Sequence, residues 1–250
     1  MRRLLLLILT LMVSAPVLAQ ELKLLSWNVF MLPSPIKRSH QHERSRAMAK
    51  ALAELDFDFI AFQEGFSHYF QRTVTGSLSA TLPYKYKLKR LKKLTHVLDS
   101  GVRAYSRYPI KVLGERYYQK CAGADCFASK GVALLEMSLE SGKRLQIAVT
   151  HMQSGQSARV YAIRRSQLKV VRELMDMFHE AEVPQILMGD LNIDALGTDE
   201  YPQVLPGIGL DPLKMIGNLT TTKSQVTKCF NGENSQILKR LDHILLRGEV

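Results

Sequence analysis

Short apolar runs that end in polar residues are the feature that most constrains the fold of this chain. Each run is too short for a typical helix and is typical of a buried strand. Two longer segments, residues 43–55 and 158–180, have helical periodicity, with Ser157 as a candidate N-cap. Alternating strands and helices predict sheets covered by helices, which is an α/β layered architecture. The expected strands are residues 22–27, 57–62, 131–137, 145–149, 185–188 and 240–246.

Polar side chains stand at or near the ends of most of these expected strands. Strand ends are where an α/β sheet opens a crevice for ligands, so we expect these side chains to converge. An isolated Asn or Asp in such a place is usually a turn cap, but six together indicate a functional site. The six residues are Asn28, Glu64, His151, Asp190, Asn192 and Asp242.

The N-terminus has the features of a secretion signal. Two arginines precede an apolar run over residues 4–13, and Val-Leu-Ala ends at Ala19. We predict that residues 1–19 are a signal peptide cleaved after Ala19. A membrane anchor is the alternative, but it needs about 20 apolar residues, and this run is shorter and followed by Pro16. Residues 20–250 are then expected to form one secreted or periplasmic domain.

The chain is strongly basic, with 34 Lys and Arg against 23 Asp and Glu and a net charge of +11. Such a charge favours polyanions or anionic membranes as partners. Part of it lies in residues 84–94, where lysines and an arginine are interleaved with Tyr and Leu. A solvated face is the more common explanation of such a stretch, and a patch facing a membrane or nucleic acid is the alternative.

Cys121 and Cys126 bracket a short loop, whereas Cys229 lies far away in the sequence. In an oxidising compartment, a disulfide between the first two is the simplest pairing, with Cys229 free or bonded outside the chain. No histidine stands at metal-ligand spacing from these cysteines, which argues against a zinc site.

Four short segments resemble signatures of the endonuclease/exonuclease/phosphatase superfamily, which has a deoxyribonuclease I-like fold. They occur in the family's order: Ser26-Trp27-Asn28, Gln63-Glu64, Thr150-His151 and Gly189-Asp190-Leu191-Asn192. Asp125 and Lys130, five residues apart, match a pair typical of the neutral sphingomyelinase branch. The resemblance implies a four-layer sandwich of two packed mixed β-sheets flanked by helices.

The resemblance also implies metal-dependent hydrolysis of a phosphodiester, most directly of sphingomyelin to ceramide and phosphocholine at a membrane surface. Glu64, helped by Asn28, would bind the cation. Oxygen ligands of this kind suit Mg²⁺, with Mn²⁺ or Co²⁺ as possible substitutes. No obligate protein partner is implied.

The remaining motif residues would act on the phosphate and the water. By resemblance, Asp190 and Asn192 would hold the attacking water and a phosphoryl oxygen. His151 would donate to the phosphate or to the leaving alkoxide. Asp125 and Lys130 would shape the phosphate side of the pocket.

The C-terminal segment departs from the family pattern. Asp242 and His243 fall in a strand that, in the family, precedes a later Ser-Asp-His-x-Pro segment carrying the general base. Only residues 247–250 follow this strand here. We count Asp242 with the catalytic residues and expect a C-terminally incomplete domain that lacks the family's last strand. Alternatively, His243 substitutes for the missing base.

Two other functions fit the same residues. A secreted nuclease of this fold would use the basic charge for phosphate contacts. It would share four site residues: Glu64, His151, Asp190 and Asn192. The Asp125 and Lys130 pair argues against it. A catalytically impaired, membrane-binding homologue is the second alternative, because of the missing base and the basic stretch.

Overall fold

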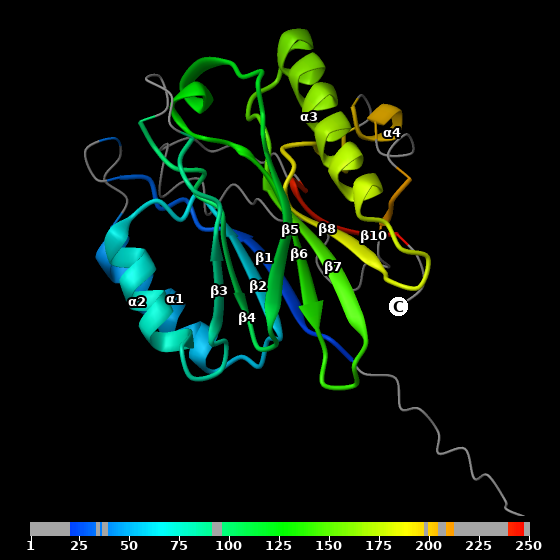
Figure 1. Cartoon of the computed structure of the whole chain (residues 1–250). Coiled ribbons are helices and arrows are strands. Elements are labelled where there is room, and N and C mark those ends of the chain that lie inside the picture. The colour runs from blue at the N-terminus through cyan, green and yellow to red at the C-terminus, as the bar shows by residue number, and fades with distance from the viewer. Residues whose placement is uncertain are drawn as a thin grey trace, which may run out of the picture.

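Two β-sheets form the centre of the molecule in the computed structural model (Figure 1). The structure describes residues 21–33, 36, 40–91, 97–197, 200–204, 209–212 and 240–247. The predicted signal peptide and Cys229 lie outside these residues. No helix in the described part of the chain is both long and apolar enough to cross a membrane.

The first sheet has four strands in the order β1-β2-β4-β3. Strands β1 and β2 are parallel, and the other two pairs are antiparallel. β3 lies at an edge, where its exposed lysines discourage pairing with another chain. The strands are β1 (Leu24–Asn28), β2 (Phe59–Gln63), β3 (Tyr84–Lys87) and β4 (Arg103–Ser106).

The second sheet has six strands in the order β5-β6-β7-β8-β10-β9. Only the central pair β7 and β8 is parallel among these described strands. The sheet is therefore mixed, like the first. Its strands are β5 (Ile110–Tyr117), β6 (Gly131–Ser138), β7 (Arg144–His151), β8 (Gln185–Asp190), β9 (Asp211–Pro212) and β10 (Asp242–Arg247).

Helices cover the outer face of each sheet, as Figure 1 shows. α1 (Gln41–Ala53) and α2 (His68–Leu78) pack on the first sheet, and α3 (Ala158–Met177) packs on the second. A four-residue helix, α4 (Tyr201–Val204), lies beside α3, and a 3₁₀ helix, η1 (Gly123–Phe127), precedes β6. The layers therefore run helix, sheet, sheet, helix, which confirms the predicted four-layer α/β sandwich.

Three apolar clusters hold these layers together. One lies between the sheets, and the other two lie under the helices. Because successive side chains of a strand point to opposite faces, β2 contributes to two clusters at once. Phe59 and Ala61 face the second sheet, whereas Ile60 and Phe62 face α1 and α2. This explains why the central strands are apolar runs rather than alternating patterns.

The expected strands and helices all occur within a few residues of their predicted bounds. Ser157 caps α3, because its hydroxyl accepts the backbone N–H of Val160. α2 was not predicted, although Ser67 caps it and Phe70, Val74 and Leu78 bury one face at four-residue spacing. β3, β4 and β5 were also missed, since their sequences are short or only partly apolar.

Candidate active site

The C-terminal ends of β1, β2, β7 and β8 meet at one end of the sandwich. In the parallel pairs, Asn28 lies opposite Gln63, and His151 lies opposite Asp190. β1 also contacts β8 across the two sheets. Residues separated by more than a hundred positions are thereby brought to one place, as the strand-end pattern predicted.

Asn28 joins the two sheets through its side-chain amide. Its Nδ2 donates to Glu64 Oε1 at 2.9 Å and to Asp190 Oδ2 at 2.8 Å. Its Oδ1 accepts the backbone N–H of Phe30 at 3.0 Å, which fixes the orientation of the amide. Two carboxylates from different sheets are thus held on either side of one amide group.

Several residues at this site have unusual backbone conformations. Glu64 and Asn192 have positive φ angles of 55° and 54°, which side chains other than glycine adopt only when their surroundings enforce it. Gly189 has φ 151°, and a Cβ there would lie 2.1 Å from the carbonyl oxygen of Thr150. Only glycine therefore lets β7 and β8 approach this closely beside the site.

His151 is buried and faces both carboxylates. Its Nε2 lies 4.0 Å from Glu64 Oε1 and 3.8 Å from Asp190 Oδ2, too far for hydrogen bonds. Lys130 Nζ lies 3.2 Å from the same nitrogen. Because an ammonium group can only donate, this contact requires an unprotonated Nε2. Burial, and then the charge of Lys130, lower the pKa of His151 well below its usual value, so the imidazole is neutral.

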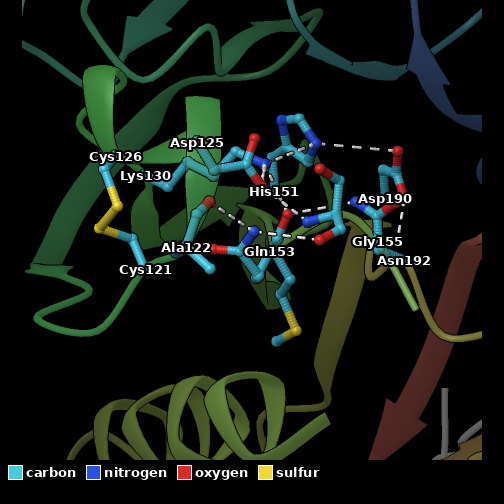
Figure 2. Close-up of polar contacts among 12 residues, drawn as sticks. Cys121, Ala122, Asp125, Cys126, Lys130, His151, Gln153, Gly155, Asp190 and Asn192 are labelled. Carbon is cyan, nitrogen blue, oxygen red and sulfur yellow. Dashed lines mark hydrogen bonds and ion pairs between the residues drawn. A yellow bond between two sulfur atoms is a disulfide. The ribbon is translucent and has the colours of Figure 1, made fainter. Parts of the chain in front are cut away.

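Asp125 and Lys130 form an ion pair of 2.9 Å, as Figure 2 shows. Lys130 Nζ also donates to the carbonyl oxygen of Met152 at 2.7 Å, and Asp125 accepts the backbone N–H of Ser154 at 2.7 Å. Burial alone would raise the pKa of Asp125, but Lys130 and the Ser154 N–H outweigh it and lower that pKa. Asp125 therefore stays ionised beside Lys130.

A disulfide between Cys121 and Cys126 closes the loop that carries Asp125, which confirms the predicted pairing. Gln153 ties this loop to the end of β7. Its Oε1 accepts the backbone N–H of Ala122 at 2.8 Å, and its Nε2 donates to the Ala122 carbonyl oxygen at 3.1 Å (Figure 2). A role for this glutamine was not predicted from the sequence.

Arg164 supports the same segment from α3. It is 1% exposed, and its Nη1 donates to the carbonyl oxygens of Gln153 at 2.9 Å and Gly155 at 2.8 Å. Its Nε pairs with Glu200 Oε1 at 3.0 Å. The sequence analysis missed both ionic residues. An arginine on the apolar face of a predicted helix was the available signal, because a buried charge needs partners.

Asn192 lies beside Asp190 and is held in place by two hydrogen bonds. Its backbone N–H donates to Asp190 Oδ1 at 2.8 Å, and its Nδ2 donates to the Met152 carbonyl oxygen at 3.1 Å. Asp242 lies opposite Asp190 in the pairing of β10 with β8. By strand alternation it faces the space between the sheets, like Ile244.

His243 is not part of this group, so the hypothesis that it replaces a catalytic base is wrong. It points to the opposite face of β10, because neighbouring residues of a strand alternate. Its Nε2 hydrogen-bonds the Ile193 carbonyl oxygen at 2.8 Å, and its ring stacks on Tyr201 with centroids 5.6 Å apart. Burial lowers the pKa of His243 to about 4. Its contacts are those of a structural histidine.

Among the described residues, neither of the two bridged carboxylates forms an ion pair with a lysine or arginine, and the charge of Lys130 only partly offsets their burial. Burial raises the pKa of both Glu64 and Asp190, and among the described residues His151 is the only basic side chain within 4.0 Å of either. In that part of the chain, no three His, Cys, Asp or Glu side chains form a ready ligand cluster. Mg²⁺ binds through one or two carboxylates and keeps several waters, so Glu64 fits this ion, while the Asn28 amide nitrogen orients that carboxylate.

Solved structures with the same fold include beta toxin from Staphylococcus aureus. Its beta-hairpin deletion mutant aligns with a TM-score of 0.82 over 92% of this chain and 89% of that chain, at 22% identity. An F277A, P278A mutant with bound magnesium ions aligns with a TM-score of 0.78 over 92% of this chain and 86% of that chain, at 21% identity.

Two characterised proteins are similar in sequence. Sphingomyelinase C 2 of Leptospira interrogans is 26% identical over 220 residues, which are 79% of this chain and 34% of that protein. The inositol phosphosphingolipids phospholipase C of Schizosaccharomyces pombe is 26% identical over 203 residues, which are 77% of this chain and 45% of that protein. The chain thus spans less than half the length of either relative.

The model of the Endonuclease/Exonuclease/phosphatase family matches residues 25–250. This match covers both sheets and every motif residue named above. The chain therefore belongs to the endonuclease/exonuclease/phosphatase family, as its strand-end motifs predicted.

Proposed function

We propose that this chain is a secreted, Mg²⁺-dependent phosphodiesterase that hydrolyses sphingomyelin to ceramide and phosphocholine. The observation that carries the proposal is the convergence of a buried and a partly buried carboxylate, a neutral histidine and a paired lysine at one end of the sandwich. Similarity to proteins named for sphingomyelin and phosphosphingolipid hydrolysis supports the substrate class. The basic charge of the chain is consistent with action at a membrane surface.

Glu64 would hold the cation, helped by Asn28, whose amide orients the carboxylate. A bound Mg²⁺ would neutralise negative charge that develops on the phosphate in the transition state. Asp190 lies on the other side of the Asn28 amide, with a raised pKa that suits a group accepting a proton from water. Asn192, held next to Asp190, would help to orient that water.

Lys130 and His151 would act on the phosphate from the second sheet. Lys130 Nζ is already positioned by Asp125 and by the Met152 carbonyl oxygen, so it would donate to a phosphoryl oxygen with little rearrangement. Once Lys130 donates to the phosphate, His151 Nε2, which lies 3.8 Å from Asp190 Oδ2, would be free to take the proton that Asp190 draws from the water and to pass it to the leaving ceramide oxygen. Both side chains are buried, which strengthens these interactions by excluding water.

The test is phosphocholine release from sphingomyelin vesicles with Mg²⁺, followed by removal of the metal with EDTA. We compare the parent chain with Glu64→Gln and with the matched control Glu140→Gln, an exposed glutamate in the turn before β7. Because metal ions contribute several kcal/mol to catalysis, Glu64→Gln should lose at least about 10²-fold in kcat/KM. The control should keep the parent rate.

Equal rates for the parent and Glu64→Gln, or release that persists in EDTA, would contradict the proposed role of this residue. Nuclease activity is the second candidate, because the basic charge of the chain also suits phosphate contacts with DNA. Cleavage of duplex DNA without phosphocholine release would assign the site to nucleic acid instead. No turnover of either substrate by a folded chain would favour a membrane-binding homologue.

A further inference from the structure

A cleft of about 590 Å³ lies beside the candidate active site. Its lining includes Phe66, which follows Glu64 by two residues and whose backbone N–H donates to the Glu64 carbonyl oxygen at 2.9 Å. The loop between β2 and α2 therefore lines the cleft and also carries a residue of the candidate active site. The opposite wall comes from the end of β3 and the segments that follow it and precede β4, with Lys87, Lys89 and Arg90.

The charge of this cleft is positive and largely uncompensated. Lys89 and Arg90 are exposed, and no ion pair joins either of them to a carboxylate within the described residues. Asp99, the acidic residue of the lining, is already paired with Lys87 at 2.9 Å and with Arg103 at 2.7 Å.

Apolar and aromatic groups stand next to these cations. The rings of His42 and Tyr69 stack with centroids 3.9 Å apart and form part of the lining. Val97, on the same cleft, is 59% exposed. Exposed apolar side chains next to lysine and arginine are typical of surfaces that lie in the headgroup region of a membrane.

We propose that this cleft binds the phosphate of an anionic lipid headgroup and so docks the protein on the membrane with Glu64 facing the lipid. Lys89 and Arg90 donate to the phosphate, while Val97 contacts the region below the headgroups. The role of this docking rests on the proposed function, since a lipid-hydrolysing site must lie at the membrane surface. The binding itself does not depend on hydrolysis.

The test measures vesicle binding by co-sedimentation, with EDTA present so that no metal-dependent hydrolysis occurs. Vesicles of phosphatidylcholine alone are compared with vesicles that also contain phosphatidylglycerol. The variant Lys89→Gln/Arg90→Gln removes both cations. Lys111→Gln/Lys143→Gln is the matched control, because it removes the same charge from exposed lysines at the opposite end of the second sheet.

The parent chain should bind the phosphatidylglycerol vesicles more tightly than phosphatidylcholine alone. Each cation near an anionic surface raises the vesicle-binding affinity on the order of fivefold. The cleft variant, which lacks two cations, should therefore bind about 30-fold more weakly than the parent chain, and the control should lose only a small part of that affinity. Equal losses in both variants would show that net charge alone attracts the protein, and would overturn the proposal.

Two further measurements distinguish a lipid headgroup from two other sources of phosphate, which are inorganic phosphate and DNA. Excess inorganic phosphate, compared with chloride at the same ionic strength, should weaken vesicle binding of the parent chain and not that of the cleft variant, because it competes for Lys89 and Arg90. Equal effects of phosphate and chloride on the parent chain would overturn phosphate binding in the cleft. Weaker duplex DNA binding by the cleft variant, with unchanged vesicle binding, would overturn membrane docking. Neither result depends on whether Glu64 supports turnover.

Discussion

The disulfide loop offers a sharp test of how the candidate site is assembled. Replacing Cys121 and Cys126 with serine opens a loop of six residues, 121–126, that contains Asp125. Loop-closure entropy for this length predicts a loss of about 2 kcal/mol in the free energy of unfolding. Such a loss is modest for a domain of this size, so the variant should fold.

Catalysis should suffer more than stability. Asp125 holds both Lys130 and the backbone N–H of Ser154, so movement of the loop displaces the lysine that contacts His151. A displacement of about 1 Å can cost on the order of 10²-fold in rate. We therefore expect kcat for phosphodiester hydrolysis to fall by about 10²-fold, with a smaller change in KM.

The assay pairs urea unfolding with separate determination of kcat and KM. Leu78→Ala is the matched control, because Leu78 is buried at the end of α2 that lies away from the site. It should lose about 2–5 kcal/mol of stability and keep its kcat. A disulfide variant that loses the expected stability but keeps the parent kcat would refute the positioning of Asp125 by this loop.

Two other predictions concern buried ionisable groups. Burial lowers the pKa of His243 to about 4, whereas an unfolded histidine titrates near 6.5. The unfolded chain binds the extra proton between these values, so the free energy of unfolding falls as the pH drops from about 6.5 to about 4, by about 3 kcal/mol. Urea titrations of His243→Gln should lack this part of the pH dependence, and an identical pH dependence in parent and variant would contradict it. Arg164→Met leaves Glu200 buried without its partner and should lower the free energy of unfolding by about 3–5 kcal/mol. A decrease below about 1 kcal/mol, measured by thermal unfolding, would show that the ion pair is not needed for stability.

Local sequence patterns predicted the elements whose stability is decided locally. The apolar face of α3 repeats at helical spacing and begins at a serine cap, so both are visible in the sequence. The central strands are apolar throughout because both faces are buried. α2 was missed because its polar and β-branched residues hide a short apolar stripe of Phe70, Val74 and Leu78.

The polar network around the site could not be predicted in the same way. Gln153 contacts Ala122 across 31 residues, and Arg164 pairs with Glu200 across 36 residues. Neither pair follows a local spacing rule, since the distance between partners depends on how the strands and loops are packed. The side of β10 on which His243 lies depends likewise on its register with β8.

By itself, the sequence determined the layered α/β architecture, the family and the set of strand-end residues, because apolar periodicity and short motifs are properties of neighbouring positions. Only the tertiary structure decided how those residues meet: Asn28 between two carboxylates, Lys130 against His151, and a basic cleft beside Glu64. The physical reason is that these contacts join different layers, and their geometry is set by the packing of the two sheets.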